Sequence, residues 1–362
     1  MKSSDGPLRL GFIGGGTNSA VGYTHFLASR LDGLFDVVAG CFSKDPDVNA
    51  ASADYFGIDS ERCHPSSEAL FESEDLDAIC VLTPTPDHKS RVIAALRAGF
   101  DVICEKALGT SVSESQEIAK VQKETGRRLL VTFNYVGYPM VREARAMIRA
   151  GAIGTLQQIY CEMPQESFAR SVSNPQSWRR SDYDIPCVSL DLGVHVVHMV
   201  DYLASGSACN LIAATENTFG NFAEVVDTVN VLASCGHNTL VNMMWGKAAL
   251  GNSNGLKFRV FGDEGSLEWE QASPEHMRYC TKDGSIRTLQ RGQEGLLEAN
   301  SARYNRFKAG HPAGFVEAFA NIYADFATTM RDGAGEEPIY DVSSAHKGLC
   351  LLHDIHQISQ VM

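Results

Sequence analysis

The chain has 362 residues, of which 44% are hydrophobic and 21% charged, as is typical of a globular protein and not of a disordered one. Roughly 100–200 residues form one domain, so this length indicates two domains. The 31 basic and 44 acidic side chains give a formal charge of −13, which disfavours nucleic acid and anionic membranes as binding partners.

The start of the chain and its cysteines bear on its location. No basic segment leads into an apolar run with a cleavage site, so we expect no secretory signal. No uninterrupted apolar stretch reaches the ~18 residues of a membrane span. The ten cysteines occur singly between Cys41 and Cys350, without a Cys-x-x-Cys pair. This pattern is typical of reduced, mostly buried thiols, and we expect a cytoplasmic protein.

In the first third of the chain, short apolar runs alternate with helix-like stretches. Residues 87–98 and 111–125 begin with polar residues and are followed by Gly99 and Gly126, as helix capping predicts. This alternation predicts a dinucleotide-binding Rossmann domain of the α/β class, with a doubly wound parallel sheet, over residues 1–138. The predicted strands cover residues 8–13, 35–42, 78–82, 102–104 and 129–133.

The first predicted strand is followed by a glycine-rich turn. Glycines let the backbone approach a pyrophosphate, which then lies at the N-terminus of the next helix. Ser19 stands in the place of the third glycine of G-x-G-x-x-G, and Gly22 supplies a glycine only after three more residues. A turn without a ligand is the alternative. The residues that the motif assigns to a dinucleotide are Gly14, Gly16, Thr17 and Asn18.

The end of the second predicted strand bears on the choice between NAD and NADP. An NAD site usually has an acidic residue here that binds the ribose hydroxyls. Ser43 and Lys44 leave room for the 2′-phosphate of NADP, whereas Asp45 is an acid displaced by two residues. The sequence leaves both cofactors open.

Beyond residue 139 the pattern changes to that of an α+β domain. A helix over residues 139–150 joins the domains, and successive strands with few helices between them predict a mostly antiparallel open sheet. This second domain covers residues 139–362, and we expect it to bind substrate. The predicted strands cover residues 157–162, 226–233, 239–245, 257–261 and 266–270, and the closing helices cover 311–330 and 343–360.

The last part of the chain carries an aromatic stripe at helical spacing. Phe315, Phe319, Tyr323 and Phe326 recur every three or four residues. Such a stripe predicts one face of a helix that is buried in a core.

Four segments stand in a fixed order along the chain. Residues 83–88 read TPTPDH, residues 104–108 read CEKAL, residues 133–135 (FNY) precede a helix that ends in GAIG at 151–154, and residues 190–198 read LDLGVHVVH. Together they resemble the Gfo/Idh/MocA oxidoreductase family, with its motifs T-P-N-x-x-H, E-K-P and D-x-G-x-H-x-x-D. Thr85, Ala107 and His198 stand where the family has asparagine, proline and aspartate.

The resemblance implies a nicotinamide dinucleotide, NAD or NADP, and a chemistry of sugar or inositol dehydrogenases. To the glycine turn, Ser43 and Lys44 it adds cofactor-binding candidates at the ends of later strands. These are Thr83, Pro84, Thr85, His88, Glu105, Lys106 and Asn134.

Lys106 is the first catalytic candidate. It follows Glu105 at the carboxyl end of a predicted parallel strand, which is the edge where such sheets bind ligands. A lysine held beside a hydroxyl group can stabilise a developing alkoxide and pass a proton. The alternative is a surface ion pair between Lys106 and a neighbour.

Asp191, His195 and His198 form the second candidate group. Their spacing of i, i+4 and i+7 predicts one helical face. Histidine, with a usual pKa of ~6.5, suits a general base that a carboxylate orients. Two buried structural histidines or a divalent metal site are the alternatives. The resemblance favours catalytic roles for Asp191 and His195 and a structural role for His198.

Further side chains are candidates for contact with the substrate. The segment 177–179 precedes the catalytic helix, and His311 lies in a segment, 310–315, that is expected to open a late helix, where a helix-start role is the alternative. The set of candidate substrate-binding residues is Tyr138, Trp178, Arg179, His195, His198 and His311.

These observations predict hydride transfer between a nicotinamide and a secondary alcohol, and the resemblance alone implies that this alcohol belongs to a sugar, cyclitol or related polyol. Glycoside cleavage through transient oxidation by a retained NAD, a cofactor-binding regulator without chemistry, and a metal-dependent isomerase are the alternatives. The resemblance also implies a homodimer or homotetramer that forms through the sheet of the domain 139–362.

Overall fold

The computed structural model describes residues 6–172, 174–236, 238–333, 337 and 340–359. The chain forms two compact units. The first comprises the described residues up to Asn134 together with Phe315–His346. The second comprises Tyr135–Gly314 together with the described residues from Lys347 onward.

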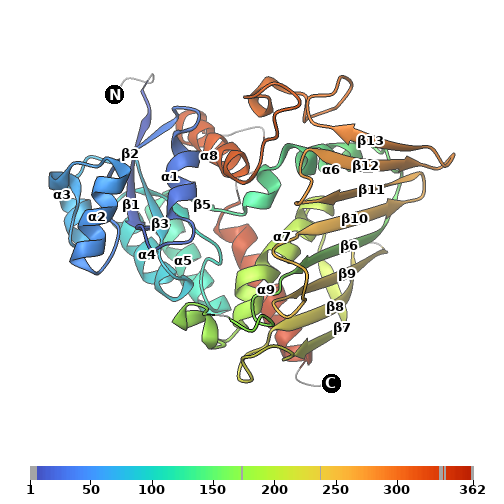
Figure 1. Ribbon diagram of the computed structural model, residues 1–362, viewed down its shortest axis with the longest axis horizontal. Coiled ribbons are helices and arrows are strands. Elements are labelled where there is room, and N and C mark those ends of the chain that lie inside the picture. The colour runs from blue at the N-terminus through green and yellow to red at the C-terminus, as the bar shows by residue number, and fades with distance from the viewer. Residues whose placement is uncertain (1–5, 173, 237, 334–336, 338–339, 360–362) are drawn as a thin grey trace. The chain divides into compact units, whose positions relative to one another are not determined.

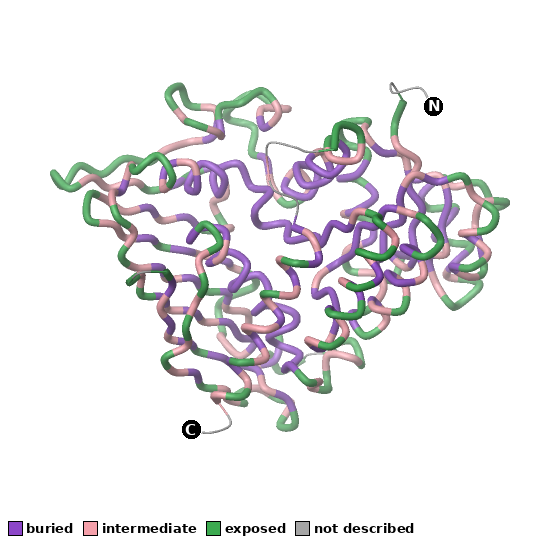
Figure 2. The backbone as a smooth tube through the Cα atoms, turned by 180° about the vertical axis from the view of Figure 1, so that it is seen from behind, coloured by how far each residue is buried: buried purple, intermediate pink, exposed green. Residues whose placement is uncertain are grey.

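The first unit contains the predicted parallel sheet. Its strands lie in the order β2-β1-β3-β4-β5, and every neighbouring pair is parallel. All residues of β3, β4 and β5 are buried, as expected of short apolar strands covered by helices on both faces (Figure 2). The strands are β1 (Leu8–Gly14), β2 (Phe35–Cys41), β3 (Ala78–Leu82), β4 (Asp101–Cys104) and β5 (Leu129–Val131).

Figure 1 shows the helices of this unit, of which α2 and α5 begin and end at recognisable capping residues. Ser111 accepts the N–H of Glu114 at the start of α5, and Gly126 adopts the left-handed conformation at its end, as predicted. The helices are α1 (Gly22–Arg30), α2 (Pro46–Phe56), α3 (Ser67–Ser73), α4 (His88–Arg97), α5 (Val112–Thr125) and α8 (Phe315–Asp332), with the short turns η1 (Ser60–Arg62) and η2 (Thr85–Asp87).

Helix α8 returns to the first unit from the far end of the sequence. Phe319, Tyr323 and Phe326 are buried in one cluster with Phe12 and Phe35 of the sheet, which confirms that the aromatic stripe is core. The prediction was wrong for Phe315, which is 40% exposed.

The late helix also begins later than predicted, at Phe315 and not at residue 311. The side chain of Arg291 donates to the carbonyl of His311, and the N–H of Ala313 donates to Glu275. These side-chain contacts hold the backbone before Phe315 in an extended loop.

The order of the strands defines where this sheet binds ligands. The chain passes from β1 to β2 on one side and then to β3 on the other, so the direction of winding reverses between β1 and β3. Gly14 and Leu82 are partners at the carboxyl ends of these two strands. In open α/β sheets the ligand binds outside such a switch point.

The second unit contains a mixed, mostly antiparallel sheet in the order β13-β12-β11-β10-β6-β9-β8-β7, in which β6 and β9 are the parallel pair. Five strands were predicted, and β7, β12 and β13 are additional. The strands are β6 (Leu156–Pro164), β7 (Cys209–Asn217), β8 (Thr228–Cys235), β9 (Thr239–Gly246), β10 (Lys257–Gly262), β11 (Gly265–Glu270), β12 (His276–Thr281) and β13 (Ile286–Gln290).

Helices α6 and α7 pack on one face of this sheet (Figure 1). No helix within the described ranges is both long and apolar enough to cross a membrane. The helical segments are α6 (Pro139–Arg149), α7 (Val194–Leu203), α9 (Val342–Ser359), the π-helical turn η5 (Ser189–Gly193), and the short turns η3 (Asn134–Gly137), η4 (Ser177–Arg180) and η6 (Ala302–Tyr304).

One cysteine pair corrects the expectation of reduced thiols throughout. Cys209 and Cys235 form a disulfide, because they are register partners on β7 and β8 with Cα atoms 4.1 Å apart. This pairing depends on strand register, which the spacing of 26 residues does not reveal. The cytoplasmic location, which rested partly on reduced thiols, stays a prediction.

Candidate active site

The glycine turn after β1 has the conformation that its residues require. Gly14 and Gly15 have φ of +77° and +76°, a region that other residues rarely adopt. A Cβ on Gly22 would lie 1.9 Å from the carbonyl oxygen of Gly15. Gly22 therefore allows the close approach of α1 that the third glycine of the motif normally provides, after the longer loop.

Ser19 has a different role in the same loop. Its hydroxyl accepts the N–H groups of Val21 and Gly22, at 3.3 and 3.2 Å, just before and at the start of α1. Ser52 of α2 binds the N–H of Thr17 at 3.0 Å. The turn is thus held by side chains of its own unit.

Residues 43–45, shortly after β2, have separate roles in the structure. Asp45 accepts the N–H groups of Asp47 and Val48, so its carboxylate caps α2. Ser43 accepts the N–H of Asp45, and Lys44 lies 3.3 Å from Asp87 at the surface. The acid nearest to the expected ribose site is therefore engaged as a helix cap.

The segment after β3 is tied to the segment after β4 by His88. The ring nitrogens of this buried histidine lie 2.6 Å from the carbonyl oxygen of Ala107 and 2.7 Å from that of Thr83. Burial lowers the pKa of His88, although both carbonyl contacts raise it. Pro84 and Thr85 lie in the loop that His88 holds. Thus His88 fixes the loops on which the other candidates stand.

Glu105 points into the first unit. Its carboxylate is 3.0 Å from Nε2 of His25 and accepts the hydroxyl of Thr132. His25 in turn lies 2.8 Å from the hydroxyl of Tyr323 of α8. Burial would raise the pKa of Glu105, but His25, with the charge of Lys106 and the bond from Thr132, holds it below its usual value.

Lys106 follows directly at the carboxyl end of β4 and is half-buried. The Lys106–Ala107 peptide bond is cis, at the place of the proline in the family motif. Oγ1 of Thr83 and Nδ2 of Asn134 are buried in the first unit without a hydrogen-bond partner among the described residues. Buried polar atoms normally have partners, so these two fit the polar groups of a bound dinucleotide.

In the second unit, Asp191 is the centre of a charged cluster. It lies in the π-helical turn η5, directly before helix α7, which carries His195 and His198. Its Oδ2 accepts from Nη1 of Arg179 and from Nζ of Lys247, each at 2.5 Å.

Lys247 was missed by the sequence analysis. It directly follows β9 and is 3% exposed. The available signal was a lysine immediately after the apolar strand that ends in Trp245 and Gly246. Its partner could not be identified, because Asp191 is 56 residues away in the sequence.

His195 and His198 lie on α7 and are both buried. The ring of Tyr135 meets that of His195 edge to face, with centroids 4.7 Å apart. Burial and the nearby Arg145 lower the pKa of His198 to about 3, so it is neutral at physiological pH. A neutral buried histidine fits a structural role.

The other substrate candidates are dispersed in the second unit. The guanidinium of Arg179 lies 4.6 Å above the ring of Trp178. Tyr138 is buried against Trp269, and His311 is exposed, with its Nδ1 near the carbonyl of Lys308. The structure thus brings Arg179 to Asp191, while His311 lies in a separate loop.

The alternative of a divalent metal site has no candidate set of ligands among the described residues. Among the residues that the structure describes, no three His, Cys, Asp or Glu side chains are grouped so that they could hold a metal ion. The carboxylate of Asp191 accepts from two cations instead.

Known proteins resemble both parts of the chain. Residues 8–133 match the oxidoreductase family with an NAD-binding Rossmann fold, and residues 141–268 match the GFO/IDH/MocA C-terminal domain. The uncharacterized oxidoreductase YfiI of Bacillus subtilis (strain 168) is 31% identical over 339 residues, which are 90% of this chain and 86% of that protein.

Of two further similar proteins, one has a named activity and the other was solved with bound ligands. The levoglucosan dehydrogenase of Pseudarthrobacter phenanthrenivorans is 26% identical over 289 residues, covering 72% of this chain and 73% of that protein. An inositol dehydrogenase homolog from Azotobacter vinelandii, solved with NADH and myo-inositol, is 27% identical. It has a TM-score of 0.91 over 99% of this chain and 96% of its own.

Proposed function

The chain belongs to the Gfo/Idh/MocA family of oxidoreductases and has an NAD-binding Rossmann domain, and from this premise we propose that it moves a hydride between a nicotinamide and a secondary alcohol of a sugar, cyclitol or related polyol. The proposal rests mainly on the arrangement of residues at the carboxyl end of β4. Glu105 there points inward to His25 and Thr132, and Lys106 follows it at the ligand-binding edge of the sheet.

The residues of the first unit would hold the dinucleotide. The turn from Gly14 to Asn18 binds the pyrophosphate at the N-terminus of α1, and Ser43 and Lys44 lie at the adenosine end. Thr83 and Asn134 supply the two unpartnered polar atoms, with Pro84 and Thr85 beside them. The nicotinamide ring, when bound, accepts or returns the hydride.

Protein side chains would manage the proton and the charge on oxygen. Lys106 donates a hydrogen bond to the substrate oxygen and stabilises the alkoxide. His195 accepts the hydroxyl proton in the direction of oxidation, and Asp191 supports the histidine that becomes charged. Arg179, whose buried Nε has no partner among the described residues, and Trp178 are proposed contacts of the substrate.

The polyol class rests on the relatives. One of them is a levoglucosan dehydrogenase, and another was solved with myo-inositol. Both ligands carry secondary hydroxyl groups on a ring, which is the group that the proposed chemistry oxidises.

The decisive experiment is a thermal-shift titration with NAD, NADH, NADP and NADPH, followed by a panel that starts with myo-inositol and levoglucosan. A dinucleotide at 100 times its dissociation constant stabilises the folded chain by about 2.7 kcal/mol. Turnover of a polyol with change of absorbance at 340 nm supports the proposal. Stabilisation by a dinucleotide without turnover of any polyol indicates a regulator, and release of nitrophenol from a glycoside without net reduction of NAD indicates the transient-oxidation reaction.

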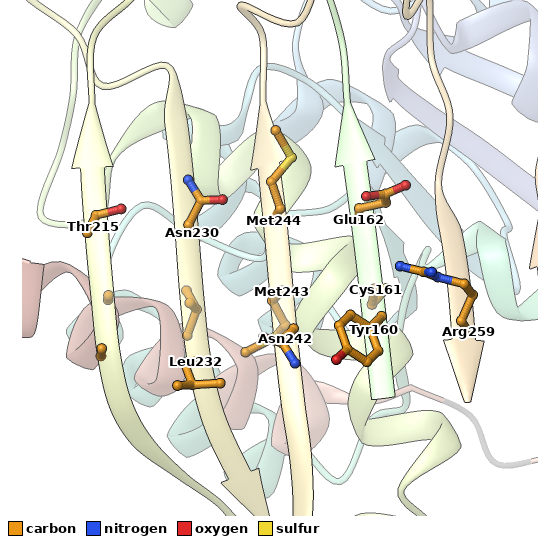
Figure 3. Close-up of a pocket in the computed structure, with 13 residues that line it drawn as sticks. Tyr160, Cys161, Glu162, Thr215, Asn230, Leu232, Asn242, Met243, Met244 and Arg259 are labelled. Atoms are coloured by element: carbon orange, nitrogen blue, oxygen red, sulfur yellow. The ribbon is translucent and has the colours of Figure 1, made fainter. Parts of the chain in front are cut away.

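We also propose a homodimer or homotetramer that uses the free face of the second unit's sheet. Side chains from neighbouring strands of this face, including Tyr160, Glu162, Leu232, Met244 and Arg259, line a depression of about 430 Å³ (Figure 3). Light scattering after gel filtration tests this, and a monomer at micromolar concentration would contradict it.

A further inference from the structure

Lys247 is a buried cation for which the proposed reaction has no role so far. It lies directly after β9, and only 3% of it is exposed. Its Nζ is 2.5 Å from Oδ2 of Asp191, and the ring of Phe168 lies 5.1 Å away. The same oxygen accepts from Nη1 of Arg179, also at 2.5 Å. Two cations therefore meet on one carboxylate oxygen.

A structural ion pair does not require this arrangement. Burial of an ammonium group is unfavourable unless an anion compensates it, and two cations on one oxygen repel each other. Arg179 alone would neutralise Asp191. The second cation adds a fixed direction, because two donors on one oxygen restrict rotation of the carboxylate, and it adds positive charge that opposes protonation of Asp191.

We propose that Lys247 is a positioning residue for the reaction: with Arg179 it keeps Asp191 ionised and fixed in orientation, so that Asp191 can support His195 as the base. This inference rests on the proposed function, in which His195 accepts the substrate proton. Lys247 acts through Asp191 and is not proposed to touch the substrate.

The other titratable groups around Asp191 do not replace Lys247. Burial raises the pKa of the Cys187 thiol to about 12, with a further increase from Asp191 that Lys247 and Arg179 oppose, so the thiol is neutral. Asp182 accepts the N–H groups of Cys187 and Val226. Burial raises the pKa of Tyr135, which therefore stays neutral.

Two neighbours of the π-helical turn, one on β9 and one on α9, have uncharged side chains. Gly193 lies against Trp245 of β9 and Leu352 of α9, and the indole of Trp245 donates to Ser189. His198 on α7 is neutral because its pKa is lowered to about 3 by burial and by the cation Arg145.

The test compares Lys247→Met, which keeps the length of the side chain without its charge, with Lys247→Arg, which keeps the charge. Lys257→Met is the matched control, because Lys257 on β10 pairs with Glu268 on β11, 2.9 Å away, and is 32% exposed in its side chain. Values of kcat and KM are measured across pH 5–9 with NAD and the best substrate of the polyol panel.

We expect Lys247→Met to lower kcat by about 10²-fold, as misplaced catalytic groups do, with little change in KM. The acidic limb of its kcat profile, which reports protonation of His195, moves to higher pH, because an Asp191 carboxylate relieved of one cation stabilises the protonated histidine more strongly. Lys247→Arg restores most of kcat and the position of the limb, and Lys257→Met resembles the wild type. A loss of kcat with an unmoved acidic limb, or no loss, overturns the inference.

A second measurement needs neither cofactor nor substrate. Asp191→Asn leaves the buried Lys247 and the partly exposed Arg179 without their anion, so the double variant Asp191→Asn/Lys247→Met should melt at a higher temperature than Asp191→Asn alone. Additive effects of the two substitutions on melting temperature would contradict the coupling. If the wild type turns over no polyol, the proposed function fails, and the melting cycle alone decides whether Lys247 controls Asp191.

Discussion

The two units bury a carboxylate in contrasting ways. In the first unit, Glu105 is bound by the imidazole of His25 and the hydroxyl of Thr132. In the second, Asp191 accepts from Arg179 and Lys247. The first network thus uses an imidazole and a hydroxyl group as donors, whereas the second uses a guanidinium and an ammonium group.

We infer different roles for the two networks, in stability for that of Glu105 and in the reaction for that of Asp191. The network of Glu105 joins α1, β4 and α8 beneath the predicted cofactor edge, and it satisfies a buried acid with an imidazole and a hydroxyl group. The cluster of Asp191 instead maintains a field of fixed charges beside α7, the helix of the proposed base. We therefore expect substitutions in the second cluster to change pH profiles of activity, and those around Glu105 to change stability.

The largest effect is expected at Lys106, which belongs to the first unit but is proposed to act in the reaction. Lys106→Met should lower kcat by about 10³-fold, since general acid–base and charge-stabilising groups contribute roughly 10²–10⁴-fold. Binding of NADH, followed by its fluorescence, should change little. Lys89→Met is the control, because Lys89 pairs with Glu117 on the surface of the same unit. A kcat within tenfold of the wild type would exclude Lys106 from the chemistry.

His198 gives the larger of two effects on stability. Its pKa is lowered to about 3 in the folded chain by burial and by Arg145, compared with 6.5 for a free histidine. The unfolded chain thus binds a proton below pH 6.5 that the folded chain does not bind until about pH 3. The contribution of His198 to the free energy of unfolding is therefore fully present above pH 6.5 and is lost as the pH falls toward 3.

Urea unfolding at pH 7 and pH 4.5 measures this dependence. His198→Asn should lose less stability than the wild type between these two values, whereas His276→Asn, at an exposed site, should behave as the wild type. Equal losses in all three proteins would mean that His198 is protonated in the folded chain.

Glu105 gives the smaller effect, and its contribution to stability is likewise lost as the pH falls. Its pKa is depressed below 4.5, because His25, Lys106 and Thr132 outweigh the effect of burial. Its contribution to stability is present above pH 4.5 and is lost as the pH falls through the lower folded value. Glu105→Gln should be less stable at pH 7 but show a flatter decline below pH 4.5 in thermal unfolding. A decline as steep as that of the wild type would show that another acid dominates.

The sequence predicted those features that depend on neighbouring residues. Strand β3 was predicted with its observed bounds, because a run of five apolar residues is enclosed by polar ones. Helix α5 was identified by Ser111 and Gly126, which cap it locally. Gly22 was recognised as a late third glycine from the loop alone, and its contact with Gly15 explains why.

Features that depend on register or on distant partners were missed. Strand β13 is an exposed edge strand without an apolar run, so no periodicity marks it. The disulfide between Cys209 and Cys235 and the contact between Lys247 and Asp191 join residues that only the folded sheet brings together.

The smallest expected effect concerns the choice between NADH and NADPH. Asp45 is engaged as the cap of α2, so Ser43 and Lys44 present no carboxylate to the adenosine ribose. We expect the wild type to bind NADPH as well as NADH. Ser43→Asp should weaken NADPH by about tenfold, because a new carboxylate repels the 2′-phosphate, and a tenfold change corresponds to about 1.4 kcal/mol. Ser43→Asn is the uncharged control, and fluorescence titration gives both dissociation constants. An unchanged ratio of the two dissociation constants in Ser43→Asp would place the 2′-phosphate away from Ser43.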